Sequence, residues 1–315
     1  MENLLIVAKQ VAILFILMGV GFACRKRRIL DESSSKGIVD VLILCVTPCV
    51  IMDAFQRPFD PGMMKELGIA FGVAALGHVA IIALAGLLVR HWADGTRRVL
   101  RMATVFSNAG FVGIPLEQAI LGDRGVFYGV AYIVVFNLFI WSWGYALMKG
   151  SAADDPEAAR KTRRTMFVNP GTVGLSLGLV LFLMPWQVPQ IVGEPIRFMA
   201  GLNTPLAMIV IGYYLAGARL GAVLRMRAAH LAAFLRLVAY PLLMTAALYP
   251  FRHVLDRDMM LALVIASAAP VAAMVSMFAA KFDRDVDASV GLVSGTTLLS
   301  IVTMPVVVAI AMSIL

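Results

Sequence analysis

Residues 107–116 read SNAGFVGIPL and place polar and helix-interrupting residues inside a long apolar run. The stretch holds one amide side chain, Asn108, together with Gly110, Gly113 and Pro115. Proline removes a backbone N–H and glycine weakens a helix, so these residues predict a break. In apolar surroundings the freed backbone groups must line a cavity or contact protein. A half-helix that begins at such a break offers free N–H groups to an anion.

A second apolar run, residues 258–280, contains Pro270 between Ser267 and Ser276. We expect a break here as well, with the two serines adding polar groups beside it. Polar and small residues in such runs also have a purely structural interpretation. Asn108 would then form a hydrogen bond between helices, and the glycines would let helices pack closely.

The ionisable residue His78 lies midway along another apolar run, residues 67–89. Histidine titrates near neutral pH, so His78 is a candidate carrier of a coupling proton. The alternative is a neutral imidazole that is hydrogen-bonded within the protein. Asp53 and Glu117 lie at the ends of apolar runs, where we expect water to reach them. No run of acidic residues marks a sodium site, so the coupling ion, H⁺ or Na⁺, stays open, and no metal site or cofactor is predicted.

The elements that must position these residues are membrane-spanning helices. Of the 315 residues, 61% are hydrophobic and 15% are charged, which is far more apolar than ordinary soluble domains. A helix needs about 20 apolar residues to cross a bilayer. We therefore predict an all-α integral membrane protein with ten transmembrane helices. They are expected at residues 4–23, 37–55, 67–89, 99–120, 125–148, 167–185, 198–218, 230–250, 258–280 and 287–314.

The net charge of +8 follows the connections between these segments rather than forming a nucleic-acid patch. Alternate connections, which share one side of the membrane, carry most of the Lys and Arg residues. Positive charge marks the cytoplasmic side, so both termini are predicted to be extracytoplasmic. The first segment lacks a basic n-region and is interpreted as a retained anchor. The three cysteines, Cys24, Cys45 and Cys49, are interpreted as packing residues.

Prolines recur at a nearly constant offset in the two halves of the chain. Thr47-Pro48 and Thr204-Pro205 are 157 residues apart, and Pro115 and Pro270 are 155 residues apart. This offset predicts two copies of a five-helix unit, residues 1–148 and 167–315, joined by a short charged cytoplasmic linker, residues 149–166. Five is an odd number, so the copies must be inverted relative to each other. Inverted repeats with interruptions at matching positions are typical of secondary transporters.

Residues 108–116, NAGFVGIPL, resemble the fourth span of the auxin efflux carrier family, whose plant members read NTLVMGIPL there. Residues 133–141, IVVFNLFIW, resemble the family's IVV-x-Q-x-x-IW segment, with Asn137 in place of glutamine. The linker is short, as in the bacterial malate and malonate carriers of the family, whereas the plant carriers have a large hydrophilic domain. The ninth span is similar through Pro270, Phe278, Ala279 and Lys281.

The resemblance implies that spans four and nine are broken and cross at mid-membrane, as in the fold of the NhaA and bile-acid transporters. It implies that a carboxylate binds beside the crossing prolines, where Asn108 donates its amide and Asn137 is a neighbour. It further implies a scaffold of spans one, two, six and seven, an elevator-type movement of the crossing bundle, and a homodimer. The predicted substrate site consists of Asn108, Gly110, Gly113, Pro115, Asn137, Ser267, Pro270 and Ser276.

We therefore predict a secondary transporter of the cell membrane that moves a small organic anion such as malate, malonate or an auxin-like acid. One alternative is a sodium-coupled symporter of the bile-acid type, which shares the same span arrangement. A second is a membrane sensor that binds without transport. An enzyme is not predicted, because the four histidines are scattered and neither HExxH nor GxSxG occurs. The second asparagine that some family members have before the ninth-span proline is replaced here by Ser267, Ala268 and Ala269.

Overall fold

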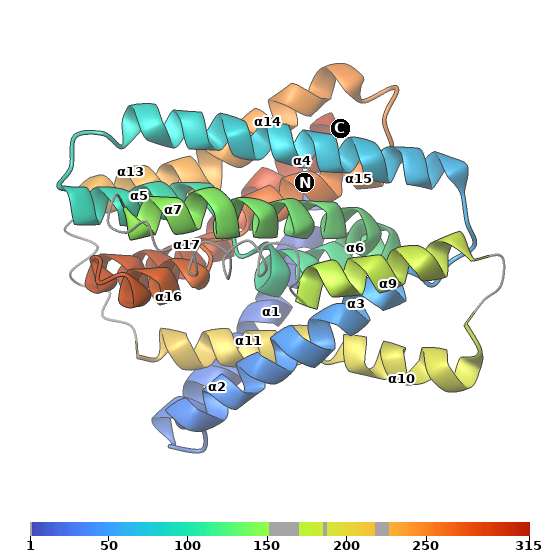
Figure 1. The fold of residues 1–315 in the computed structure, drawn as a ribbon, viewed down its shortest axis with the longest axis horizontal. Coiled ribbons are helices and arrows are strands. Elements are labelled where there is room, and N and C mark those ends of the chain that lie inside the picture. The colour runs from blue at the N-terminus through green and yellow to red at the C-terminus, as the bar shows by residue number, and fades with distance from the viewer. Residues whose placement is uncertain (1, 151–169, 185–187, 218–226) are drawn as a thin grey trace.

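A computed structural model describes residues 2–150, 170–184, 188–217 and 227–315 of the chain (Figure 1). These residues are helical, with no β-strand among them. The predicted linker, residues 149–166, lies outside the described residues beyond Gly150. Figure 1 shows α2, α10 and α11 along the lower side of the molecule and α4, α13 and α14 along the upper side.

The first half of the chain forms long helices separated by short turns. They are α1 (Glu2–Lys26), α2 (Glu32–Val41), η1 (Leu42–Val46), α3 (Thr47–Phe55), α4 (Pro61–Leu88), α5 (Asp94–Val105), η2 (Ala109–Gly113), α6 (Ile114–Phe139), η3 (Ile140–Gly144) and α7 (Tyr145–Lys149). The chain kinks within α6 at Gly122, whose positive φ of 65° glycine tolerates readily. This kink separates the predicted fourth and fifth spans.

The second half repeats this pattern of long and interrupted helices. They are α9 (Pro170–Leu183), α10 (Gln190–Gly201), α11 (Asn203–Leu215), α13 (Arg227–Phe234), η4 (Leu235–Ala239), α14 (Tyr240–Leu248), η5 (Tyr249–Phe251), α15 (Arg257–Ala268), α16 (Met274–Lys281) and α17 (Val286–Ile314).

Seven helices of the described chain are long and apolar enough to cross a membrane, compared with the ten spans that the sequence predicts. Two predicted spans, residues 99–120 and 258–280, are each interrupted, so their parts are individually short. The predicted span at 167–185 corresponds to the 14-residue α9. The seven runs are Leu4–Lys26, Glu32–Phe55, Pro61–Leu88, Ala109–Lys149, Gln190–Leu215, Ala229–Phe251 and Val286–Ile314.

Widened π-helical turns precede three of the prolines within helices. η1 ends just before Pro48, η2 just before Pro115, and η4 just before Pro241. A proline has no N–H to donate and its ring crowds the preceding turn, so the helix widens locally there. These turns shift the side chains of their helices away from regular helical positions.

Charged side chains cap the ends of some of the described helices. Asp60 and Asp256 accept hydrogen bonds from the first backbone N–H groups of α4 and α15. At the other end of α4, Arg101 donates to the carbonyls of Gly86, at 3.0 Å, and Val89, at 3.2 Å. A cation at a helix C-terminus donates hydrogen bonds to the free carbonyls and is attracted by the negative end of the helix dipole, so it stabilises the helix.

The helices α1 and α11 pack at backbone distance through two glycines. A Cβ atom placed on Gly21 would lie 2.0 Å from the oxygen of Ile209, and one placed on Gly212 would lie 1.9 Å from the oxygen of Met18. Only glycine permits this approach, which is common between helices in membranes. In a separate contact, α3 packs against α9. The helices of predicted spans one and seven, and those of predicted spans two and six, therefore form close pairs.

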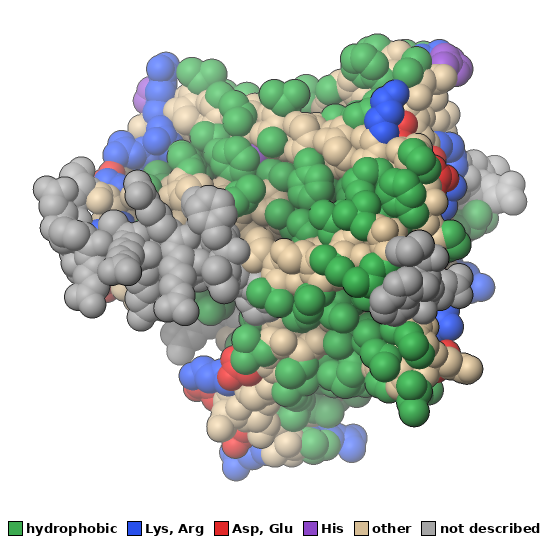
Figure 2. Space-filling view, turned by 45° about the vertical axis from the view of Figure 1, so that its right-hand side comes forward, with side chains coloured by type: hydrophobic (Ala, Val, Ile, Leu, Met, Phe, Trp, Pro, Cys, Tyr) green, Lys and Arg blue, Asp and Glu red, His purple; other side chains and the backbone are tan. Residues whose placement is uncertain are grey.

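Large apolar side chains lie on the outer surface of the molecule. Leu76 is 72% exposed, Phe198 is 73% exposed and Val302 is 68% exposed. Figure 2 shows hydrophobic side chains over the middle of one face and charged side chains toward its margins. An apolar surface of this extent is expected to face lipid.

Candidate functional site

The two interrupted helices meet at their breaks. The N–H of Asn108 donates to the carbonyl of Pro270 at 2.6 Å, and the N–H of Ala272 donates to the carbonyl of Phe106 at 2.9 Å. These bonds form an isolated antiparallel bridge between Ser107 and Val271. Each break leaves backbone N–H and carbonyl groups without partners in their own helix. The extended segment of the other helix supplies hydrogen-bond partners for them. The crossing, defined as residues 106–108 and 269–273, is therefore built from both halves of the chain.

The two breaks have different local causes. Ala269 has extended backbone angles, φ −62° and ψ 148°, because the ring of the following Pro270 disfavours a helical conformation there. In the first half the chain leaves the helix at Phe106, and Pro115 comes only after η2, in the first turn of α6. Pro270 therefore lies at its break, whereas Pro115 lies just beyond its own and widens the turn that follows.

Asn108 and Gly110 border open space at the crossing. Asn108 is partly exposed, and no hydrogen bond of its side-chain amide is found among the described residues. A Cβ atom on Gly110 would have no neighbour within 4 Å, while one on Gly113 would lie 3.4 Å from the Cα of Ala266. The Cβ position of Gly110 is thus open, and Gly113 permits close packing of η2 on α15. The free amide is available for a ligand.

The other predicted polar residues differ in how they are bonded. Ser267 Oγ donates to Val264 O at 2.7 Å, and Asn137 Nδ2 donates to Ile133 O at 2.9 Å, both within their own helices. The hydroxyl of Ser276, in α16, is buried without a hydrogen-bond partner in the described chain. The crossing therefore brings Asn108 and Pro270 together, while Gly110 and Ser267 lie next to it along the chain. The Asn137 amide is directed at its own helix.

His78 is fully buried in α4 among aromatic rings. Its Nδ1 lies 2.8 Å from the carbonyl of Ala74, and its ring stacks on Phe139 with centroids 5.3 Å apart. The ring of Tyr132 is 4.9 Å away. A hydrogen bond to a carbonyl requires a proton on Nδ1, which leaves Nε2 as an acceptor in the neutral ring. A neutral imidazole that is hydrogen-bonded within the protein would have this bonding. The Nε2 atom of His78 has no hydrogen-bond partner in the described chain.

Arg236, which is absent from the predicted site, is a charged residue directly beside the crossing. It lies in η4 with 0% of its surface exposed. Its Nη1 donates to Val105 O at 2.9 Å, and its Nη2 donates to Ser267 O. The sequence carried a signal, because Arg236 is the one Lys or Arg residue within 230–250 and a charge inside a span is a functional candidate.

Glu117 is buried, whereas the sequence led us to expect that water reaches it. The residue is 1% exposed, and its Oε2 has no hydrogen-bond partner among the described residues. The chain turns at Gly122, more than one helical turn later, so Glu117 faces the returning arm of α6. A Cβ atom on Gly129 would lie 1.9 Å from Oε2, so the carboxyl group packs directly against this glycine and would have to move if a larger residue stood there.

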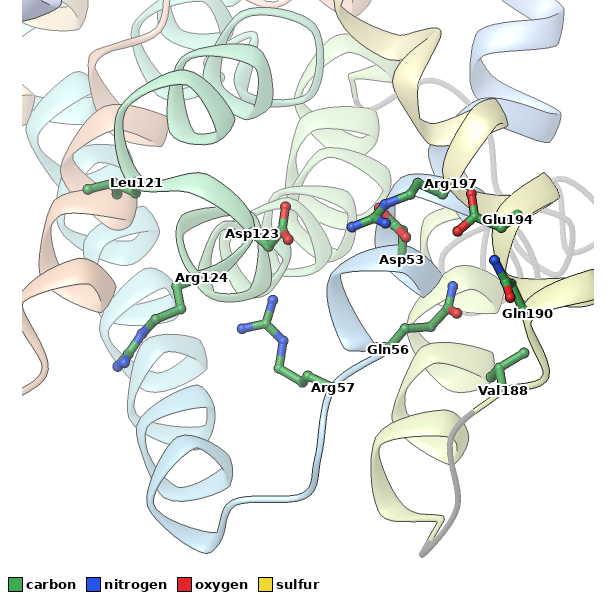
Figure 3. A pocket seen from close by; sticks show the side chains of 11 residues that line it. Asp53, Gln56, Arg57, Leu121, Asp123, Arg124, Val188, Gln190, Glu194 and Arg197 are labelled. Atoms are coloured by element: carbon green, nitrogen blue, oxygen red, sulfur yellow. The ribbon is translucent and has the colours of Figure 1, made fainter.

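A polar cleft of about 700 Å³ lies between α3, α10 and the kinked end of α6 (Figure 3). In Figure 3, Arg197 lies beside Asp53, and Arg57 points toward Asp123. Burial lowers the pKa of the Arg57 guanidinium, and the nearby Asp123 acts in the opposite direction. The cleft thus combines both signs of charge at a water-accessible end of the helices. Its charged lining residues are Asp53, Arg57, Asp123, Arg124, Glu194 and Arg197.

Comparisons with known proteins agree with this architecture. The family described as membrane transport protein matches residues 6–308, a range that includes both interrupted helices. An uncharacterized transporter of Methanothermobacter thermautotrophicus is 26% identical over 298 residues, which are 92% of this chain and 93% of that protein.

Proposed function

Because the chain belongs to the membrane transport protein family, and so is a multi-pass membrane transporter, we propose that it is a secondary transporter of a small organic anion. The substrate class is a carboxylate such as malate, malonate or an auxin-like acid. The observation that carries this proposal is the partly exposed Asn108 amide at the crossing, which has no hydrogen-bond partner among the described residues. A carboxylate would accept from this amide and lie near the N-terminal end of η2 and α6.

The proposed architecture has ten spans in two inverted repeats, residues 1–148 and 167–315. Two helix contacts support it. If one half is rotated onto the other, span one (α1) takes the place of span six (α9), and span seven (α11) takes the place of span two (α3). The contact of α1 with α11 is therefore equivalent to the contact of α9 with α3, and both are present. The same operation exchanges the two interrupted helices, which bond to each other at their breaks.

In the proposed mechanism, spans one, two, six and seven form a scaffold and the crossing bundle moves against it as an elevator. The polar cleft supports this division, since α3 and α10 belong to the scaffold and the kinked end of α6 belongs to the bundle. We place the cleft at the extracytoplasmic opening, on the side of both termini. We further propose that the protein works in the cell membrane as a homodimer through the scaffold.

Counterflow in proteoliposomes tests the function. Vesicles loaded with unlabelled malonate, malate, succinate or indole-3-acetate are expected to accumulate the same labelled acid for at least one of the four. Asn108→Ala is expected to lower this rate about ten- to a hundredfold, as loss of a hydrogen bond to a charged group would. The matched control is Gln118→Ala, which removes an exposed amide from α6.

Unchanged counterflow in Asn108→Ala would remove Asn108 from the site. Saturable binding of an acid without any counterflow would instead favour the sensor interpretation. A strict requirement for sodium would favour the bile-acid type of symport.

A further inference from the structure

The first halves of both interrupted helices end at the crossing with free carbonyl groups. These are the carbonyls of Thr104 and Val105 at the end of α5 and of Ser267 at the end of α15. A helix C-terminus carries a partial negative charge, and two such ends meet here away from water. In transporters with discontinuous helices, these C-terminal ends and unwound carbonyls are where a coupling sodium ion is coordinated.

Arg236 occupies this position in the structure. Its Nη1 lies 2.9 Å from Val105 O and 3.4 Å from Thr104 O, and its Nη2 donates to Ser267 O. One guanidinium therefore serves the carbonyl ends of both helices, which its planar set of donors allows. The ring of Tyr240 lies 4.9 Å from the guanidinium carbon and adds a cation–π contact.

The charge of Arg236 is not neutralised by a carboxylate. The ion pairs found among the described residues do not include it, and its carbonyl partners are backbone dipoles. The π-helical turn η4, which precedes Pro241, carries Arg236 on span eight. The crossing thus holds a permanent positive charge that is supplied by the chain itself.

We propose that Arg236 is a resident cation that takes the place of a coupling sodium ion at the crossing, so that the protein assembles and transports its anion without sodium. Arginine stays protonated at every physiological pH, so this cation neither dissociates nor titrates. Arg236 acts here as a positioning residue, because it fixes the two helix ends. The inference rests on the proposed function only for the part that concerns transport.

Thermal unfolding of the purified protein tests the cation site without any substrate. The wild-type Tm is expected to be equal in sodium, potassium and choline chloride. Arg236→Ala is expected to lower the Tm by on the order of 10 °C, as removal of a buried charged partner does. Millimolar methylguanidinium, or sodium, is expected to recover part of this loss.

The control is Arg101→Ala, which removes an arginine from the carbonyls at the aqueous end of α4. Its Tm is expected to respond equally to all three salts and not to methylguanidinium. Arg236→Lys, which keeps one charge but cannot reach both helix ends as a fork, is expected to unfold at an intermediate temperature. It also provides the test if Arg236→Ala does not fold.

Three results would overturn the inference. They are saturable binding of ²²Na⁺ to the wild-type protein, an unchanged Tm in both Arg236 variants, and a loss in Arg236→Ala that no cation recovers. Malonate counterflow is expected to be equal in sodium and choline buffers. Absence of counterflow for every acid would count against the proposed function and leave the Tm results on Arg236 standing.

Discussion

The backbone N–H of Asn108 donates to the carbonyl of Pro270 at 2.6 Å and so joins the two interrupted helices at their breaks. This bond links a residue of the first half of the chain to a residue of the second half. It also places the free Asn108 side chain next to the proline that interrupts α15. The candidate site therefore depends on a backbone conformation as much as on side chains.

Pro270→Ala is expected to lower counterflow more than about tenfold while the protein still reaches the membrane. Alanine lets α15 continue through the break, which would withdraw the carbonyl of residue 270 from Asn108. Pro305→Ala is the control, because Pro305 lies inside α17 without interrupting it. Equal losses in the two variants, measured per reconstituted protein, would argue against a special role for the break.

Substitutions at Gly110 are expected to separate transport from stability. Since a Cβ there meets nothing within 4 Å, Gly110→Ala should leave the Tm within about 2 °C of wild type. Gly110→Phe should fill the open space at this position, two residues after Asn108, and abolish counterflow at a similar Tm. Gly113→Phe is the contrasting variant, because its side chain would meet Ala266 and lower the Tm. Normal counterflow in Gly110→Phe would show that the space is not part of the substrate path.

For His78 we expect a structural effect from His78→Gln. The lost bond to Ala74 and the lost stacking on Phe139 should lower the Tm by several degrees. Counterflow of the variant should keep the pH profile of the wild-type protein. Loss of stimulation by a pH gradient in this variant alone would instead identify His78 as the proton carrier.

Gly212→Ala is expected to destabilise the scaffold. Its methyl group would lie 1.9 Å from the oxygen of Met18, and overpacking of this kind costs about 1–3 kcal/mol. Gly19→Ala is the matched control, because a Cβ on Gly19 meets nothing within 4 Å and alanine favours the helix. Thermal unfolding of both variants checks the contact, and equal Tm values would contradict it.

The helical membrane architecture and both breaks could be read from the sequence. Apolar run length predicts spans, and Pro270 predicts its own break because a proline acts on its neighbours in the chain. The resemblance to the auxin efflux carrier family was confirmed by the family match. The ten-span inverted repeat and the roles of the site residues stay predictions.

The rest depends on contacts that sequence spacing does not encode. Pro115 was expected to contribute to the break in its span, but the chain leaves the helix at Phe106, where pairing with Ala272 compensates for the lost helix bonds. Glu117 was expected to meet water, but the turn at Gly122 buries it against Gly129. Arg236 was visible as a charge inside a predicted span, yet its carbonyl partners come from different halves of the chain.

The shared backbone bonds and the single guanidinium at the crossing also restrict how the molecule can deform. Separating the two interrupted helices would strip a donor or an acceptor from each of them in a medium that offers no replacement. Sliding one past the other would do the same, so neither can travel alone. Any large movement of α5 is expected to carry α15 and η4 with it, as one stiff unit that tilts or shifts without changing its internal spacing.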